Sequence, residues 1–407
     1  IMALVKPFAA IMPKLGMEKL IAALPYDVYN REEAVEVVKN NPDSFLRIDR
    51  AETNFGPETD TYADCVYDKA KELINTWIEE GRLVKQDKPM FYIYQEIMNG
   101  RPQTGIVGCA SVADYENNII KKHENTLAAK EADRIRHIDT TNMQTGPIFL
   151  AFRSNKEIDA FLAQKTSEKP YYDFVSEDGI THKVWLVDDD AEIESVEGFF
   201  AAMNAIYIAD GHHRCASACK VSAKRHIEGK VQESDFFMSV LFPENQLKIM
   251  DYNRVVKDLN GYDVATFLEE LETYCHIGGS DIPVKPAKKG QVGMYLDGQW
   301  FSLEFKTEYL SDDPVEGLDV SILQKYVLDG MLDIKDPKND KRIDFVGGIR
   351  GLEELERRVN SDCRVAFAMY PTDINELFDV ADASRLMPPK RTWFEPKLRS
   401  GLFLHSI

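Results

Sequence analysis

The sequence predicts a mixed α/β fold, and three local patterns support that prediction. Asn99-Gly100 stands between two strand-like runs, 91–98 and 104–112, which is a strong signal for a β-hairpin. Asp297-Gly298 marks a second hairpin of the same kind. Residues 63–82 instead space their apolar side chains at helical intervals. Strands and helices are therefore both expected along this chain.

The other elements follow from periodicity, capping residues and turn residues. We expect helices at 31–40, 119–137, 158–165, 215–228, 264–275, 318–332 and 349–359. We expect strands at 45–48, 146–152, 206–209, 236–242, 292–296, 299–305 and 364–370. Residues 155–205 are predicted to be an excursion from the main fold, with a hairpin at Asp178-Gly179 and a solvated acidic turn at 188–190.

Composition and charge are typical of a soluble globular protein. Of 407 residues, 44% are hydrophobic and 29% are charged. Lys and Arg number 49 against 68 Asp and Glu, and the net charge of −19 argues against a general nucleic-acid or anionic-membrane surface. No apolar run approaches the roughly 20 residues that span a bilayer, and the start is too short in its apolar part for a secretory signal. Six scattered cysteines favour a reduced, cytoplasmic protein.

A dense group of polar side chains lies between a predicted strand and a predicted helix. Asp210, Gly211, His212, His213 and Arg214 are consecutive. A strand-to-helix turn directs backbone N–H groups and the positive end of the helix dipole at one place, which suits a phosphate. The glycine allows close approach of a ligand, and the arginine and histidines add donors. The alternative is a capped helix with partly buried histidines and Asp210 as its N-cap.

Cys215 and Cys219 come just after this group and are four residues apart from each other. A zinc site is therefore an alternative interpretation. Together with His212 and His213 they could complete a tetrahedron. Adjacent histidines rarely aim both rings at one ion, however, and the small neighbouring residues are typical of a packed helix face. We therefore favour helix packing over zinc for these cysteines.

The chain ends with a basic tail at 385–402, which holds five cations in eighteen residues. Its three prolines exclude one continuous helix. On an acidic chain, such a loop could supply Lys390, Arg391, Lys397 or Arg399 to an anion site. A solvated tail that its aromatic residues hold to the surface is the equal alternative.

These motifs resemble a known family. The tail, the turn at 210–214, the His123-Glu124 pair and the turn at 24–27 are similar to those of the bacterial and archaeal family catalogued as domain of unknown function 1015. The His-Glu pair and the turn at 210–214 also recur in the ParB/sulfiredoxin superfamily, especially in its free serine kinase branch. Taken alone, Glu124 near the start of a helix would only complement the helix dipole.

The resemblance implies a domain organisation in three parts. A ParB/sulfiredoxin-like nucleotide-binding core is expected at 116–232, with an insertion at 155–205. An N-terminal α/β segment, 1–115, and a C-terminal α/β segment, 233–407, would flank it, and the basic tail belongs to the latter. We expect these parts to be closely packed.

The resemblance also implies a phosphotransferase that uses ATP or ADP and Mg²⁺ to phosphorylate a small hydroxylated metabolite, with free L-serine as the first candidate. Glu124 would act as the base on the acceptor hydroxyl. His123 and the turn at 210–214 would hold the nucleotide, and Asp210 would be catalytic and lie closest to the metal. Lys390, Lys397 and Arg399 could close over phosphate.

The sequence also bears on other activities and partners. His212 stands where the sulfiredoxin branch has a cysteine, which argues against peroxiredoxin repair. The acidic composition argues against the DNA clamp of the ParB branch, so neither nucleic acid nor membrane is an expected partner. A nucleotide-binding sensor or scaffold and a nucleotide phosphohydrolase stay open as alternatives, and so does a homodimer.

Overall fold

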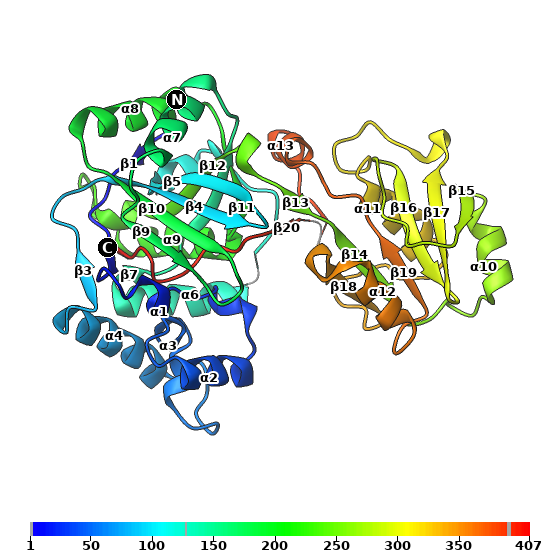
Figure 1. Cartoon of the computed structure of the whole chain (residues 1–407), viewed down its shortest axis with the longest axis horizontal. Coiled ribbons are helices and arrows are strands. Elements are labelled where there is room, and N and C mark those ends of the chain that lie inside the picture. Colours follow the sequence, from blue (N-terminus) through cyan, green and yellow to red (C-terminus); the bar gives the residue numbers. More distant parts are fainter. Residues whose placement is uncertain (1–2, 127, 389–391) are drawn as a thin grey trace. The chain divides into compact units, whose positions relative to one another are not determined.

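The computed structural model describes residues 3–126, 128–388 and 392–407, and the chain forms two compact units. The first unit comprises Ile1–Leu247 with Pro396–Ile407, and the second comprises Lys248–Glu395. Both contain helices and strands (Figure 1), so the predicted mixed α/β class is confirmed. These units differ from the three predicted segments, because strands on both sides of residues 115 and 232 join one sheet.

The first unit is built on a mixed sheet of nine strands among the described residues. Its spatial order is β6 (Ile120–Lys121), β11 (Ile206–Asp210), β8 (Ile148–Phe152), β12 (Phe236–Pro243), β5 (Arg101–Ser111), β4 (Phe91–Met98), β10 (Thr181–Val187) and β9 (Tyr172–Val175), with β1 (Val5–Lys6) paired to β5. β11 is parallel to β6, and β12 is parallel to β8. The predicted hairpin at Asn99-Gly100 is confirmed as β4 and β5.

Helices pack on this sheet through apolar side chains. α7 (Lys156–Thr166), α8 (Asp190–Ala201) and α9 (His212–Arg225) share one buried cluster with the sheet, and α6 (Ala128–Thr141) packs against α9. A second cluster joins the N-terminal helices to Leu404 of the tail. These helices are α1 (Glu18–Ile21), α2 (Arg31–Asn40), α3 (Leu46–Asp49) and α4 (Asp64–Glu79). The remaining elements are α5 (Val112–Glu116), β2 (Ile11–Pro13), β3 (Leu83–Lys85), β7 (Met143–Gln144) and β21 (His405–Ser406).

Two predictions for the first unit were wrong. Residues 45–48 were expected to form a strand but lie in and next to the one-turn helix α3. Phe45, Leu46 and Ile48 are all buried there, whereas a strand with one exposed face would expose one of the neighbours Phe45 and Leu46. The helix expected from 119 begins only at Ala128, because β6 occupies its start. Residues 155–205, the predicted excursion, contribute β10, which pairs along its length with β4 of the central sheet.

The second unit contains an antiparallel sheet of six strands among the described residues. Its order is β15 (Cys275–Ser280), β17 (Gln299–Phe305), β16 (Gln291–Leu296), β19 (Val365–Ala368), β14 (Tyr252–Val256) and β18 (Ile343–Gly347). The predicted hairpin at Asp297-Gly298 is confirmed as β16 and β17. The helices are α10 (Val264–Leu271), α11 (Asp319–Leu323), which continues as the π-helix Gln324–Asp329, α12 (Gly351–Val359) and α13 (Ile374–Asp382), and β13 (Ile249–Met250) pairs with β20 (Trp393–Phe394).

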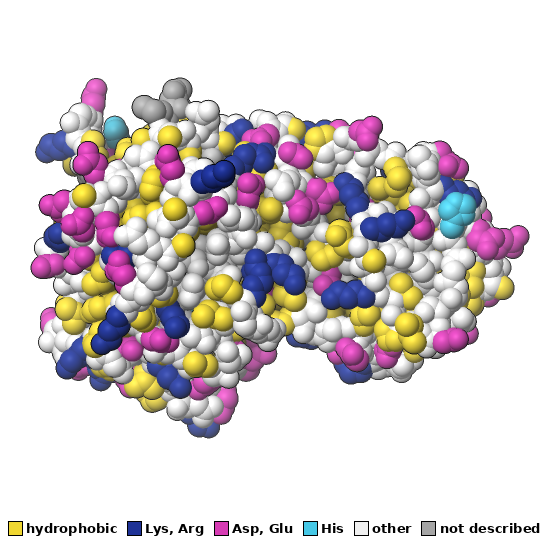
Figure 2. Space-filling view, turned by 45° about the horizontal axis from the view of Figure 1, so that its top comes forward, with side chains coloured by type: hydrophobic (Ala, Val, Ile, Leu, Met, Phe, Trp, Pro, Cys, Tyr) yellow, Lys and Arg dark blue, Asp and Glu magenta, His cyan; other side chains and the backbone are white. Residues whose placement is uncertain are grey.

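The surface mixes charges of both signs. Figure 2 shows acidic and basic side chains interspersed on one face, with hydrophobic side chains scattered among them. In the part of the chain that the structure describes, no helix combines the length and the apolar character needed to cross a lipid bilayer. All six cysteines carry free thiols.

Candidate functional site

The chain turns from β11 into α9 at Gly211, which adopts φ 93° and ψ 29°. This left-handed conformation favours glycine. A Cβ at Gly211 would also lie 3.1 Å from Nη2 of Arg214, whose guanidinium folds back over the turn. Asp210 accepts a 2.9 Å hydrogen bond from the N–H of Gly211, and no side chain caps the helix at Gly211, so the alternative interpretation with Asp210 as N-cap does not describe this turn. The start of α9, where an α-helix has N–H groups with no intrahelical acceptor, therefore lies at this turn.

His123 and Glu124 lie beside this turn because β6 and β11 are parallel neighbours that end at the same edge of the sheet. The rings of His123 and His212 meet edge to face with their centroids 4.4 Å apart. Oε2 of Glu124 lies 3.9 Å from Nδ1 of His212. Two predicted site segments that are far apart in the sequence thus come together in the first unit.

Both of these histidines are buried and neutral near pH 7. Burial lowers the pKa of His123 well below its usual value, and His212 adds to that effect. Burial likewise lowers the pKa of His212 to about 4. Nε2 of His212 lies 3.4 Å from the backbone N–H of His123 and can accept from it, which assigns the ring proton to Nδ1, the atom that faces Glu124. Neither ring nitrogen of His123 has a hydrogen-bond partner among the described residues.

Asp210 holds two cations beside the turn. Its Oδ2 lies 3.7 Å from Nζ of Lys397 and 4.0 Å from Nη2 of Arg214. Burial by itself would raise the pKa of Asp210, but Lys397 and Arg214 outweigh it, so the pKa is lowered. Arg214 also donates a hydrogen bond to the carbonyl oxygen of Pro147. Since the side chain of Asp210 is 45% exposed, its ionised carboxylate is reachable from solvent.

The basic tail contributes to the site through Lys397. Arg399 takes a different direction and pairs with Asp178 in the turn between β9 and β10. Arg399 is 3% exposed, so this ion pair anchors the tail to the sheet and keeps the guanidinium away from the turn at 210–214. Lys390 and Arg391 lie outside the described residues.

Among the described residues, no three His, Cys, Asp or Glu side chains come together as metal ligands. Cys215 and Cys219 belong to the apolar cluster under α9, and His213 lies within electrostatic range of Glu131 on α6. Asp210 is a single accessible carboxylate, which fits Mg²⁺ because this ion is held by one or two carboxylates together with phosphate oxygens.

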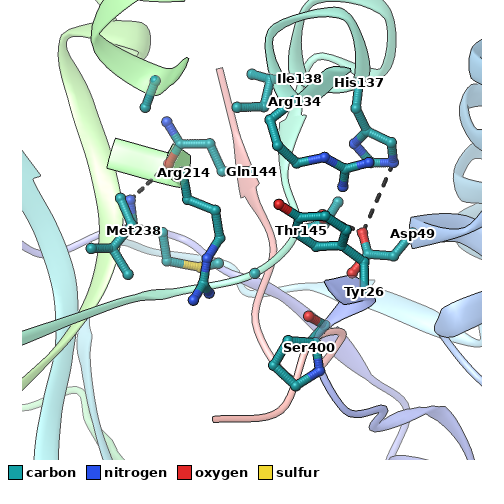
Figure 3. Close-up of a pocket in the computed structure, with 14 residues that line it drawn as sticks. Tyr26, Asp49, Arg134, His137, Ile138, Gln144, Thr145, Arg214, Met238 and Ser400 are labelled. Atoms are coloured by element: carbon teal, nitrogen blue, oxygen red, sulfur yellow. Dashed lines mark hydrogen bonds and ion pairs between the residues drawn. The ribbon is translucent and has the colours of Figure 1, made fainter. Parts of the chain in front are cut away.

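The sequence did not predict the pocket that lies beside Arg214 (Figure 3). Its cavity volume is about 30 Å³, and it is partly open to solvent. The polar side chains that it brings together are Tyr26, Asp49, Arg134, His137, Thr145 and Ser400. The sequence drew attention to the turn that contains Tyr26 and to the tail that contains Ser400. The other residues belong to α3, α6 and the approach to β8, and only the tertiary fold brings them together.

Comparison with known proteins gives one family and several distant structural likenesses. No curated protein gives a significant match to the sequence. Similar solved structures include a free serine kinase in complex with ADP (14% identity, TM-score 0.34, covering 68% of this chain and 84% of that chain). A conserved hypothetical protein from Pyrococcus furiosus is similar as well (16% identity, TM-score 0.34, 70% and 91%).

A third likeness is to SbnI with a C-terminal truncation from Staphylococcus aureus (11% identity, TM-score 0.37, covering 72% of this chain and 84% of that chain). With TM-scores below 0.5, these likenesses establish neither a fold family nor an activity for this chain. The family described as "Protein of unknown function (DUF1015)" matches residues 5–321, which is well over half of the sequence. The chain belongs to the DUF1015 family.

Proposed function

We propose that this chain is a phosphotransferase that moves a phosphoryl group from ATP or ADP to a hydroxyl group of a small metabolite, with free L-serine as the first acceptor to test. The supporting observation is the meeting of Glu124 with the turn at 210–214, where its Oε2 lies 3.9 Å from His212. Arg214 and Lys397 flank the same turn. A base for a hydroxyl and donors for phosphate oxygens are then adjacent, and positioning with charge neutralisation is what phosphoryl transfer needs.

In the proposed reaction, the acceptor oxygen forms a bond to the terminal phosphorus of the nucleotide. The bond from that phosphorus to the bridging oxygen breaks, and the nucleotide leaves with one phosphate fewer. Glu124 takes the hydroxyl proton. Arg214, Lys397 and the first N–H groups of α9 stabilise the charge on the phosphate oxygens. When bound beside Asp210, Mg²⁺ would neutralise part of the phosphate charge.

The two buried histidines have a positioning role in this proposal. Because burial lowers the pKa values of His123 and His212, neither adds a full positive charge to the site near pH 7. His212 can direct its Nδ1 proton toward Glu124, and the edge-to-face contact with His123 fixes the plane of its ring. The orientation of the base therefore depends on a packed pair of neutral rings.

The function is tested by incubating the full chain with ATP or ADP, Mg²⁺ and a panel of amino acids and polyols, and measuring an added phosphate by mass spectrometry. Glu124→Gln should lower turnover by about 10²- to 10⁴-fold, the usual contribution of a general base. Nucleotide affinity should stay nearly unchanged, since the phosphate donors are intact. Glu116→Gln, an exposed position on α5, is the matched control and should keep full turnover.

Each other outcome has a definite meaning. Equal turnover in Glu124→Gln would remove this carboxylate from the mechanism. Nucleotide consumption that does not depend on any added acceptor would replace the transferase with a phosphohydrolase. Nucleotide binding without a phosphorylated product or nucleotide turnover would identify a sensor or scaffold.

A further inference from the structure

The pocket beside Arg214 has the features of a ligand site separate from the phosphate turn. The Arg214 guanidinium lies between the two. Its Nη2 is 3.1 Å from the place that a Cβ would take at Gly211, and its Nη1 is 3.6 Å from the corresponding place at Gly146. A molecule in the pocket would therefore adjoin a side chain that is proposed to hold phosphate.

Gly146 keeps one side of the pocket open. Its φ is outside the left-handed region, so the backbone does not require glycine at this position. A Cβ would instead lie 3.1 Å from Oγ of Ser400, close to Arg214. The absent side chain thus leaves space next to the hydroxyl group of Ser400 and the guanidinium of Arg214.

Two hydrogen-bond donors face this space without a protein partner. Arg134 is 7% exposed, and its Nε and Nη2 each lie 2.8 Å from the carboxylate of Asp133. Its guanidinium stacks on Tyr26, 3.9 Å from the ring centroid. Among the described residues, Nη1 of Arg134 and Oγ of Ser400 have no hydrogen-bond partner, although Ser400 is only 3% exposed. Donors in such positions require an acceptor from water or a ligand.

One of the acceptors that line the pocket, Oδ1 of Asp49, is already engaged. Asp49 accepts a 2.7 Å hydrogen bond from the hydroxyl group of Thr145 and lies 3.9 Å from Nε2 of His137. Burial lowers the pKa of His137, which keeps its ring neutral. The remaining wall consists of the polar Gln144 and of the apolar residues Pro25, Ile138, Ile148, Ala218 and Met238. The lining thus offers donors to anionic oxygen atoms and a dry surface to hydrocarbon.

We infer that this pocket binds the carboxylate of the phosphoryl acceptor through Arg134 and Ser400, and that the acceptor is a small hydroxy carboxylic acid. The inference rests on the proposed function for the role of acceptor. The planar edge of a guanidinium matches the two oxygens of a carboxylate, and a side chain held by Asp133 and Tyr26 is already ordered for that contact. The hydrocarbon part of the acid lies against the apolar wall.

Binding can be measured without nucleotide by isothermal titration calorimetry on the full chain. The probes are D-glycerate and L-serine, each compared with its carboxyl-free counterpart, glycerol or ethanolamine, and with inorganic phosphate. At least one acid should bind about tenfold or more tightly than its counterpart, because a charge-assisted hydrogen bond is lost with the carboxylate. Equal affinity within both pairs, or tighter binding of phosphate than of either acid, would overturn the inference.

Two variants address different parts of the pocket. Arg134→Gln should abolish the preference for the acid, whereas Arg136→Gln should retain it. Arg136 is a matched control on the same helix, where its guanidinium stacks on Tyr67 at 4.3 Å outside the pocket. Gly146→Ala should weaken the acid about tenfold by filling the space beside Ser400, while leaving Arg134 intact. An unchanged preference in folded Arg134→Gln, or in Gly146→Ala if Arg134→Gln does not fold, would refute the assignment.

These results separate the inference from the function on which it rests. Phosphoryl transfer to polyols and acids alike would support the transferase and eliminate the carboxylate site. Carboxylate binding that depends on Arg134, without any transfer, would support the pocket and eliminate the transferase.

Discussion

Gly211→Ala adds one methyl group at the point where β11 meets α9, and its effect can be derived from the structure. Alanine at φ 93° costs about 1–2 kcal/mol, because Cβ crowds the backbone in the left-handed conformation. The same methyl would lie 3.1–3.2 Å from three guanidinium atoms of Arg214. Arg214 must then move away from the turn, so the substitution should affect both stability and nucleotide binding.

We expect two measurable changes in Gly211→Ala. The apparent melting temperature should fall by several degrees, since about 1 kcal/mol corresponds to roughly 2–4 °C in a domain of this size. The dissociation constant for ATP or ADP should rise about tenfold, because a displaced guanidinium loses a charge-assisted hydrogen bond to phosphate. Differential scanning fluorimetry and titration calorimetry measure these two quantities.

Gly229→Ala is the matched control for this prediction. Gly229 also has a left-handed φ, 73°, but nothing lies within 4 Å of the place that its Cβ would occupy. It should lose a similar amount of stability and keep its nucleotide affinity. Unchanged affinity in Gly211→Ala would show that the Arg214 guanidinium does not bind phosphate, and equal loss in Gly229→Ala would show that the effect is not local.

Two further predictions concern charged groups. Lys397→Gln should weaken nucleotide binding several-fold, and more so at low salt, because it removes a cation from the turn. Arg399→Gln should leave nucleotide binding unchanged, because the Arg399 guanidinium pairs with Asp178. Titration calorimetry at two salt concentrations compares them, and equal losses would contradict the role of Lys397. A hydrogen bond with His405 lowers the pKa of Glu233 to about 2. A carboxyl group whose pKa is lowered on folding stabilises the fold at pH values above its usual pKa of 4.5, and this stabilisation is lost as the pH falls through about 2. Glu233→Gln should therefore lower the melting temperature at pH 7 more than at pH 3.

The sequence predicted those elements whose signals are local. Asn99-Gly100 and Asp297-Gly298 determine their hairpins through their own positive φ values, and both hairpins are present. Residues 45–48 gave the wrong prediction because four apolar and charged residues fit a strand and a one-turn helix equally well. The choice depends on packing against α4, which a four-residue pattern does not contain.

In the candidate site too, the sequence predicted the residues that have a local signal and missed those that depend on tertiary contacts. The turn at 210–214 was found because its polar residues are consecutive, and the pairing of β6 with β11 explains why His123 and Glu124 lie next to it. Arg134, in contrast, is one of many charged residues in a polar helix. Its burial, its stacking on Tyr26 and its place in the pocket depend on contacts between distant segments.

Asp210 determines the charge that an incoming phosphate would meet. Any anion that approaches Arg214 or Lys397 also approaches this carboxylate, whose Oδ2 lies within 4.0 Å of both. His123 and His212 cannot offset it, because burial lowers their pKa values and keeps them neutral. A divalent cation that takes one carboxylate and phosphate oxygens as ligands would balance the site. In the proposed function, these charges would favour a nucleotide that arrives with Mg²⁺ over a free phosphate ion.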